Sequence, residues 1–519
     1  MKPALKMKIA AILLPGMSLM AQDVDQDTTI PDEPDSPAPI NETTESETVL
    51  LRQTMDGTQY AADITLMEGV TPLFPLRKQL TPWDPFAPTP TPVNQPKIDP
   101  LLPDPLEILM RPIRNSEAWT QDNLGISWNI YYTLLYQYAS RTVLNPNTNE
   151  YYGRNAGTGR LDLGINWDIF DIPDVAHGQI GLLMRNGVVI GQPDTYRAGN
   201  AVGSIPVSPD ALYWGDQTSL CLAYWQQGFC NDQLVITAGK IHPNQYLALS
   251  RIANDESTQF ISGVFDGLNT LGPSLGNYAP GVALQFVPDD GFYFNAVLLD
   301  AQGGPNTGFN TVGNGSWWMG GQLGFVPRFK NTNGDELIGN WAVMFAATNY
   351  GVVESNNGQP LTALAPGLNP PPAPVQPINT QFALNPIILG AGVQPSSDAE
   401  GHGFGLLIEQ QITPEITVLA EYGLSSPDLS TIQEAVNLVA AHTSPFGRDD
   451  DMIGVGLNWS VPSSMYITDR REEIFMEMFY RLQITASMQL TPDLQILFRP
   501  STGESKPIAI FGLRLRTQF

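Results

Sequence analysis

The chain has 519 residues with 26 basic and 52 acidic side chains, so its formal net charge is −26. This sign of charge disfavours nucleic acid as a partner, because the phosphate backbone would repel the protein. Charged residues make up only 15% of the chain, and 47 Gly and 45 Pro supply turn formers. Together these values favour many strands joined by many loops.

The N-terminus has the pattern of a signal peptide. Three lysines lie within the first eight residues, an apolar run covers 9–14, and a small-residue cleavage site ends at Ala21. We therefore expect residues 1–21 to be removed on export. No other uninterrupted apolar stretch reaches about 18 residues, so the sequence predicts no transmembrane helix. If the exported chain is embedded in a membrane, it is expected to be a β-barrel, which also pairs its backbone groups inside lipid.

Residues 22–112 are expected to form a disordered extension. The stretch 22–50 is acidic and rich in Thr, Ser and Pro, and the stretch 70–112 is dense in proline. Neither composition supports a packed core. Within the extension, the short piece 106–110 is a candidate for a helix that lies against the mouth of a barrel.

From residue 124 onward, apolar and polar residues alternate with the period of a β-strand. Apolar residues at even positions of 124–138 share one face, and polar residues such as Asn129 and Thr133 share the other. Segment 212–225 has a weak pattern, and segment 431–442 could equally be a helix on propensity. The predicted strands are 124–138, 159–170, 178–190, 212–225, 232–241, 281–287, 292–300, 317–326, 339–350, 402–411, 416–424, 431–442, 452–460, 473–485, 490–499 and 508–519.

The lengths of the connections give an independent check. Outer-membrane barrels have an even number of strands, short periplasmic turns and long external loops. Counting back from the terminal Phe519, the short connections fall on one side and the long ones, such as 242–280 and 351–401, on the other. The alternation requires 431–442 to be a strand, and it places the N-terminal extension in the periplasm.

Two of the closing strands, 473–485 and 508–519, carry the clearest pattern. Both alternate apolar and charged residues, and the chain ends on Phe519. Long hairpin-linked strands of this kind are typical of the closing strands of an outer-membrane barrel. The sequence therefore predicts an all-β protein, a 16-stranded antiparallel transmembrane barrel. It would lie in outer-membrane lipid, with Phe519 as its contact with the barrel-assembly machinery.

Two cysteines, Cys221 and Cys230, remain in an exported chain. We expect a single disulfide between them, because export leads to an oxidising compartment. A metal pair is the weaker alternative, since no histidine lies close by in sequence.

No catalytic constellation stands out. The four histidines occur singly, and no nucleophile elbow, metal-ligand spacing or phosphate loop is present. We therefore expect no enzymatic activity, no cofactor and no metal.

The chemistry of a pore is that of its lining. In one reading a few inward side chains converge in a constriction that binds sugar hydroxyls, since Arg offers five donors and carboxylates only acceptors. In the other reading these side chains only face the water of the pore and do not contact the solute. The wall candidates are Arg160, Asp162, Arg185, Glu409, Glu421, Glu477, Arg481, Arg499, Arg514 and Arg516.

Two further features bear on the lining. Phe475 and Phe479 share the inward face of their strand, where they could stack on a sugar ring or pack against an inward-folded loop. Loop 242–280 is the best candidate for such a loop, because it mixes apolar residues with Arg251, Asp255 and Glu256. Loop 351–401 is Pro-rich and is expected to form an external cap.

Several stretches resemble the carbohydrate-selective porins of the OprB family. They are RLDLGINWDIF at 160–170, GKIHPNQY and NDESTQF within 239–260, the stretch 278–304, FGRDDDMIGVGLNW at 446–459, and the closing segment from Glu472. The resemblance covers roughly residues 115–519. It implies a sixteen-stranded barrel, monomeric or trimeric, through which sugars diffuse across the outer membrane.

The leading hypothesis is therefore passive diffusion of mono- or oligosaccharides. The acidic charge motivates an alternative, a general or cation-preferring porin. A surface adhesin or structural barrel is a third possibility. An outer-membrane enzyme is disfavoured, because no Ser and His pair lies on neighbouring strands near the lipid face.

Overall fold

The computed structural model describes residues 100–519 apart from a set of short gaps and one long one. The predicted signal peptide and the predicted extension up to residue 99 lie outside the described residues, as does most of loop 351–401. The gaps are 146–149, 173–174, 191–197, 205–216, 231, 268, 273–277, 289–290, 355–392, 397–398, 465–471 and 502–505.

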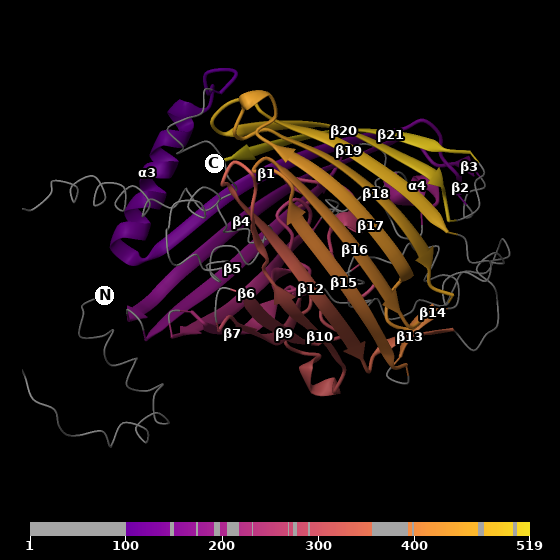
Figure 1. The fold of residues 1–519 in the computed structure, drawn as a ribbon, viewed down its shortest axis with the longest axis horizontal. Coiled ribbons are helices and arrows are strands. Elements are labelled where there is room, and N and C mark those ends of the chain that lie inside the picture. Colours follow the sequence, from indigo (N-terminus) through magenta and orange to yellow (C-terminus); the bar gives the residue numbers. More distant parts are fainter. Residues whose placement is uncertain are drawn as a thin grey trace, which may run out of the picture.

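One closed antiparallel barrel dominates the structure (Figure 1). The sheet has 17 strands, of which β11 (Arg328–Lys330) pairs only with β12, and the other sixteen form the barrel. Closure is direct, because β1 pairs with both β4 and β21. The sixteen strands are β1 (Ile126–Ala139), β4 (Asn155–Ile172), β5 (Ala176–Val189), β6 (Thr218–Phe229), β7 (Leu234–Ile241), β8 (Ala279–Phe286), β9 (Phe292–Asp300), β10 (Trp317–Phe325), β12 (Glu336–Thr348), β15 (Gly401–Gln411), β16 (Ile416–Ser425), β17 (Ile432–Thr443), β18 (Met452–Pro462), β19 (Glu473–Gln483), β20 (Met488–Arg499) and β21 (Ile508–Gln518).

Each predicted strand has its counterpart in the barrel, including 431–442, which is β17 and not a helix. The alternation predicted from sequence separates two faces. Outward apolar side chains such as Phe345, Leu438 and Phe511 are 46%, 50% and 54% exposed, whereas inward ones are mostly buried. An apolar outer belt of this kind suits contact with lipid.

The two ends of the barrel differ in their connections. One end, here called the short-turn end, carries turns such as 412–415 and 484–487. The other, the long-loop end, carries the connections 190–217, 242–278 and 349–400. The alternation inferred from loop lengths is confirmed. The long-loop end also holds the hairpins β2 (Leu144–Asn145) with β3 (Glu150–Tyr151) and β13 (Gly351–Glu354) with β14 (Val393–Ser396), and the short helix α4 (Ala198–Val202).

Helix α3 (Glu107–Leu124) corrects the predicted extension, which was expected to run to residue 112 with a helix only at 106–110. Pro112 lies inside the helix, and Gly125 ends it in a left-handed conformation at φ 69°. The segment is tied to the barrel at the short-turn end, where the Leu102 amide donates to the Ile484 carbonyl at 3.0 Å. Figure 1 shows α3 at this end, near the C-terminus. Among the described residues, no helix has the length and apolar character needed to cross a membrane.

The predicted disulfide between Cys221 and Cys230 is wrong, because both thiols are free. Strand β6 begins later and ends later than predicted, so Cys221 lies near its start and Cys230 directly follows its end. Nine residues of extended chain span roughly 30 Å. A disulfide needs Cα atoms less than about 7 Å apart.

Thiol alkylation should distinguish the two cysteines. In the folded barrel, Cys230 should react with a maleimide readily, because it is exposed, whereas Cys221 is buried and should react only after unfolding. Mass spectrometry of labelled peptides would measure both. If both thiols resisted labelling equally, and a reductant made both reactive, the predicted disulfide would be present after all.

Candidate functional site

The connection between β7 and β8, residues 242–278 and here called the lumen loop, folds into the barrel. Ala248, Ile252 and Phe265 in this loop are 0%, 1% and 1% exposed. They share one hydrophobic cluster with inward residues of strands around the barrel, among them Leu407 and Phe475. The prediction that this loop packs inside the barrel is confirmed.

Inward glycines of the wall make room for the lumen loop. A Cβ atom added at Gly456 would lie 2.6 Å from Cζ of Phe265, and one added at Gly423 would meet Thr270. Strand glycines commonly mark a close approach of another segment. The glycines of GVG in β18 and of YGL in β16 therefore leave space that the loop side chains occupy.

Phe475 and Phe479 belong to this packing. Phe479 contacts Phe260 with ring centroids 4.8 Å apart, and Phe475 contacts Phe265 at 6.1 Å. Their exposures of 0% and 2% leave no free ring face for a sugar. Of the two readings left open by the sequence, packing against the inward loop is the correct one.

Arg160 on β4 is the centre of a buried charge cluster. Its guanidinium donates to Glu256 of the lumen loop at 2.6 Å, to Ser257 at 2.7 Å and to Asp162 at 3.0 Å. Arg185 on β5 lies 2.9 Å from Asp162. Each of the three guanidinium nitrogens of Arg160 donates a hydrogen bond, and the side chain is 0% exposed, so this cluster fastens the loop to the wall.

Arg185 extends the cluster to the end of the lumen loop. Its Nη1 donates to the Tyr278 hydroxyl at 2.6 Å. The Tyr278 ring in turn lies against His242, with centroids 4.4 Å apart. Both ends of the loop thus meet at Arg185.

On β19 the inward side chains hold the loop backbone. The Glu477 carboxylate accepts from the amides of Ile261 and Ser262, the latter at 3.0 Å. Arg481 donates to the Thr258 carbonyl at 3.5 Å and to the Asp450 carbonyl at 3.2 Å. Both residues thus have their partners outside their own strand.

The arginines of β21 have different partners. Arg514 donates to the carbonyls of Glu256 and Gln259 at 2.7 and 2.8 Å. The Arg516 guanidinium stacks on the Tyr131 ring, 3.9 Å from its centroid. Arg514 is therefore a further anchor of the loop backbone.

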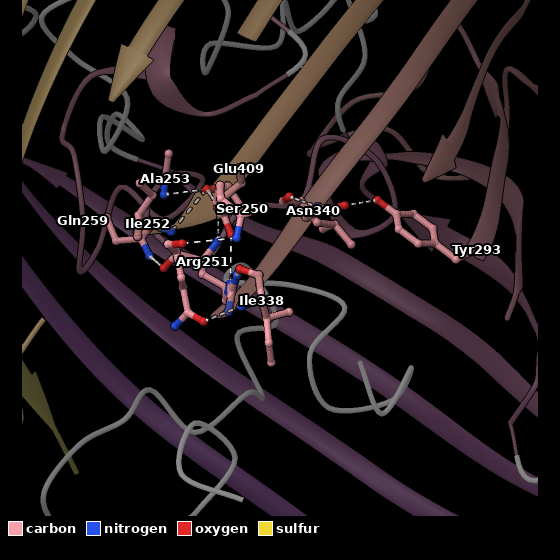
Figure 2. A network of polar contacts seen from close by, with 12 residues as sticks. Ser250, Arg251, Ile252, Ala253, Gln259, Tyr293, Ile338, Asn340 and Glu409 are labelled. Atoms are coloured by element: carbon pink, nitrogen blue, oxygen red, sulfur yellow. Dashed lines mark hydrogen bonds and ion pairs between the residues drawn. The ribbon is translucent and has the colours of Figure 1, made fainter. Parts of the chain in front are cut away.

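Figure 2 shows the opposite anchor, where Arg251 of the loop lies between strands β12 and β15. Glu409 accepts from the Arg251 Nε at 2.9 Å and from the Ser250 hydroxyl at 2.5 Å. Arg251 also donates to the Ile338 carbonyl at 2.7 Å, and the Asn340 amide donates to the Leu249 carbonyl at 2.9 Å. With a side chain 26% exposed, Arg251 retains access to solvent.

Three further predicted residues have their hydrogen-bond or ion-pair partners within the wall or within the loop itself. Arg499 is exposed at the end of β20 and pairs with Glu472 at 3.0 Å. Asp255 accepts the amide two residues further along its own loop at 2.8 Å. Glu421 accepts from the Asn437 amide at 2.9 Å. The prediction that Arg499 lines the lumen is wrong, because a register shift beside Ile474 displaces the end of its strand.

Neutral wall amides were missed by the sequence reasoning, which considered only charged lining. Asn295 donates to the Tyr246 carbonyl at 2.7 Å, and Asn437 donates to the Val264 carbonyl at 2.8 Å. A signal was present, since inward Asn and Gln recur on many strands. Buried amides need partners, and here the loop backbone supplies them.

Burial changes the titration of groups in the loops and turns. It lowers the pKa of His242 to about 3, so this ring is neutral and its Nδ1 accepts the Asn244 amide at 3.2 Å. Burial raises the pKa of Glu256, against the opposing effect of Arg160. It likewise raises the pKa of Asp450, in the turn after β17, to about 7.

Comparisons with known proteins agree with this architecture. The family model described as carbohydrate-selective porin, OprB family, matches residues 144–519. A high-pH structure of Pseudomonas putida OprB has a TM-score of 0.56 at 13% identity, covering 78% of this chain and 96% of that one, which shows the fold. Its low-pH structure gives 0.43 at 11% identity over 78% and 96%. A Rh. blastica porin mutant gives 0.41 at 11% over 76% and 100%. No curated protein shows significant sequence similarity to the chain.

Proposed function

Because the chain belongs to the OprB family of carbohydrate-selective porins, we propose that its lumen loop forms the constriction through which small sugars diffuse. The protein is an outer-membrane channel for passive sugar diffusion, not an enzyme. The observation that carries the proposal is the fastening of the loop to the wall by Arg160, Glu409, Glu477 and Arg514. Because these side chains fasten the loop to the wall on opposite sides of the barrel, the loop would keep a passage of fixed width without forming a tight binding site.

Passive diffusion requires binding weak enough for release. The charges of the cluster are paired with one another and buried, so they present few free ions to a solute. Such a lining suits neutral, hydroxyl-rich solutes. Arg251 is the charged loop residue with the clearest access to solvent, and we expect it to contact the solute.

The second candidate, a cation-preferring porin, is supported by the net charge of −26. Liposome swelling with sugars of graded size, together with reversal potentials in a KCl gradient, separates the two. We expect swelling with mono- and disaccharides that falls steeply with size, and weak ion preference. Swelling that follows solute charge alone, with strong cation preference, would favour the second candidate.

The surroundings of the barrel are also part of the proposal. The extension before α3 would lie in the periplasm, because α3 lies at the short-turn end. We further propose lipid around the apolar belt, recognition of Phe519 by the assembly machinery, and a homotrimer. Chemical cross-linking of the protein in native membranes would test the trimer.

A further inference from the structure

A second feature of the lumen lies on the inward face of β4, β5 and β6, beside the hydrophobic cluster of Leu183, Leu222 and Tyr278. Tyr224 on β6 is directly opposite Gly181 on β5, which is directly opposite Asn166 on β4. A Cβ atom added at Gly181 would lie 2.2 Å from Cζ of Tyr224, so the tyrosine ring lies flat over the glycine. The ring is only partly buried, and the glycine lets it lie along the wall.

Polar side chains surround this ring. One row nearer the short-turn end, Asp168, Gln179 and Gln226 pair across β4, β5 and β6. Gln179 donates to Asp168 at 3.0 Å, and Gln226 donates to the Thr237 hydroxyl at 3.3 Å. These bonds hold the two amides along the wall.

The polar groups around Tyr224 remain accessible, in contrast to those under the lumen loop. Asn166, Gln179 and Gln226 are partly exposed, and the Asp168 side chain is 51% exposed. Wall amides beneath the loop, such as Asn295 and Asn340, are 1% exposed. The Oδ1 of Asn166 is itself buried and accepts no hydrogen bond within the described part of the chain, so the exposed part of this side chain lies elsewhere.

This arrangement matches the two chemical faces of a pyranose. A sugar ring has an apolar face of C–H groups, which packs on an aromatic ring, and an equatorial edge of hydroxyls, which bonds to amides and carboxylates. We propose that Tyr224, flanked by Asn166, Gln179 and Gln226, is a sugar-binding subsite distinct from the constriction. The inference rests on the proposed function, since it assumes that sugars reach this wall.

The subsite lies on the short-turn side of the constriction. Asn166 is four residues from Asp162 along β4, about 13 Å at ~3.4 Å per residue. A sugar that passes the Arg160 cluster therefore meets the Tyr224 ring next. Two weak sites in series bind a solute loosely and pass it on.

Block of single-channel current by maltotriose in planar bilayers tests the subsite. For Tyr224→Ala we expect half-block to need roughly 3- to 10-fold more sugar, the value of one aromatic contact. Tyr224→Phe keeps the ring and should remain within about twofold of the native protein. Phe345→Ala is the matched control, because Phe345 lies over Gly321 in the same way on the outward face and should leave the block unchanged.

The outcomes separate this inference from the proposed function. Native protein that conducts but shows neither maltotriose block nor sugar swelling overturns both. Native block with an unchanged Tyr224→Ala overturns the subsite alone. If Tyr224→Ala fails to fold, Tyr224→Leu fills most of the same volume without a flat ring, and native-like block by that variant would refute the subsite.

Discussion

Replacing Arg160 with alanine should open the channel and weaken its native state. The substitution removes three hydrogen bonds and leaves Glu256, 1% exposed, without its nearest cation. Breaking one side of a buried ion pair costs about 3–5 kcal/mol. We expect the lumen loop to leave the wall at β4, so single-channel conductance should rise. Cation preference should rise too, because a positive charge has left the lumen.

Arg499→Ala is the control for that substitution. It makes the same chemical change, but Arg499 is exposed and its ion pair with Glu472 lies in solvent. Exposed pairs contribute roughly 0–1 kcal/mol. Conductance and reversal potential should stay at the native values. If Arg160→Ala behaved like Arg499→Ala, the cluster would not be what holds the constriction.

Placing leucine at Gly456 should displace the lumen loop by volume alone. The native glycine leaves space for the Phe265 ring, and a side chain there would occupy that space. Overpacking of this kind typically costs about 1–3 kcal/mol. We expect the loop to move away from β18 while the strands stay paired. Conductance should then rise, and the barrel should still change its migration on a gel when it is heated, as a folded barrel does.

Limited proteolysis would detect this displacement of the lumen loop. Arg251 is the single lysine or arginine within 242–280, and its guanidinium is held by Glu409 in the native barrel. Trypsin should therefore cleave after Arg251 in Gly456→Leu and spare the native protein. Gly313→Leu is the control, because a Cβ at Gly313 has no heavy atom within 4 Å. Cleavage of native protein at an equal rate would show that the loop is not held in place.

The strands were determined by the sequence alone. Alternation with period two separates a lipid face from an inward face on most strands. With the help of connection lengths, even the ambiguous segment 431–442 could be placed. Both signals are local, and the bilayer imposes them because an outward polar residue is costly there. The inward fold of the lumen loop also showed in its mixed composition.

What each inward residue does was decided by the tertiary structure. Strand parity places Phe475 and Arg160 inside, but only the path of the lumen loop decides whether they meet solute or protein. The observed bounds of β6 separate the two cysteines along the strand, and the register shift beside Ile474 turns Arg499 outward. The ring of Tyr224 became a platform because a glycine stands opposite it on the next strand. Such pairings join residues far apart in the chain, so no local pattern records them.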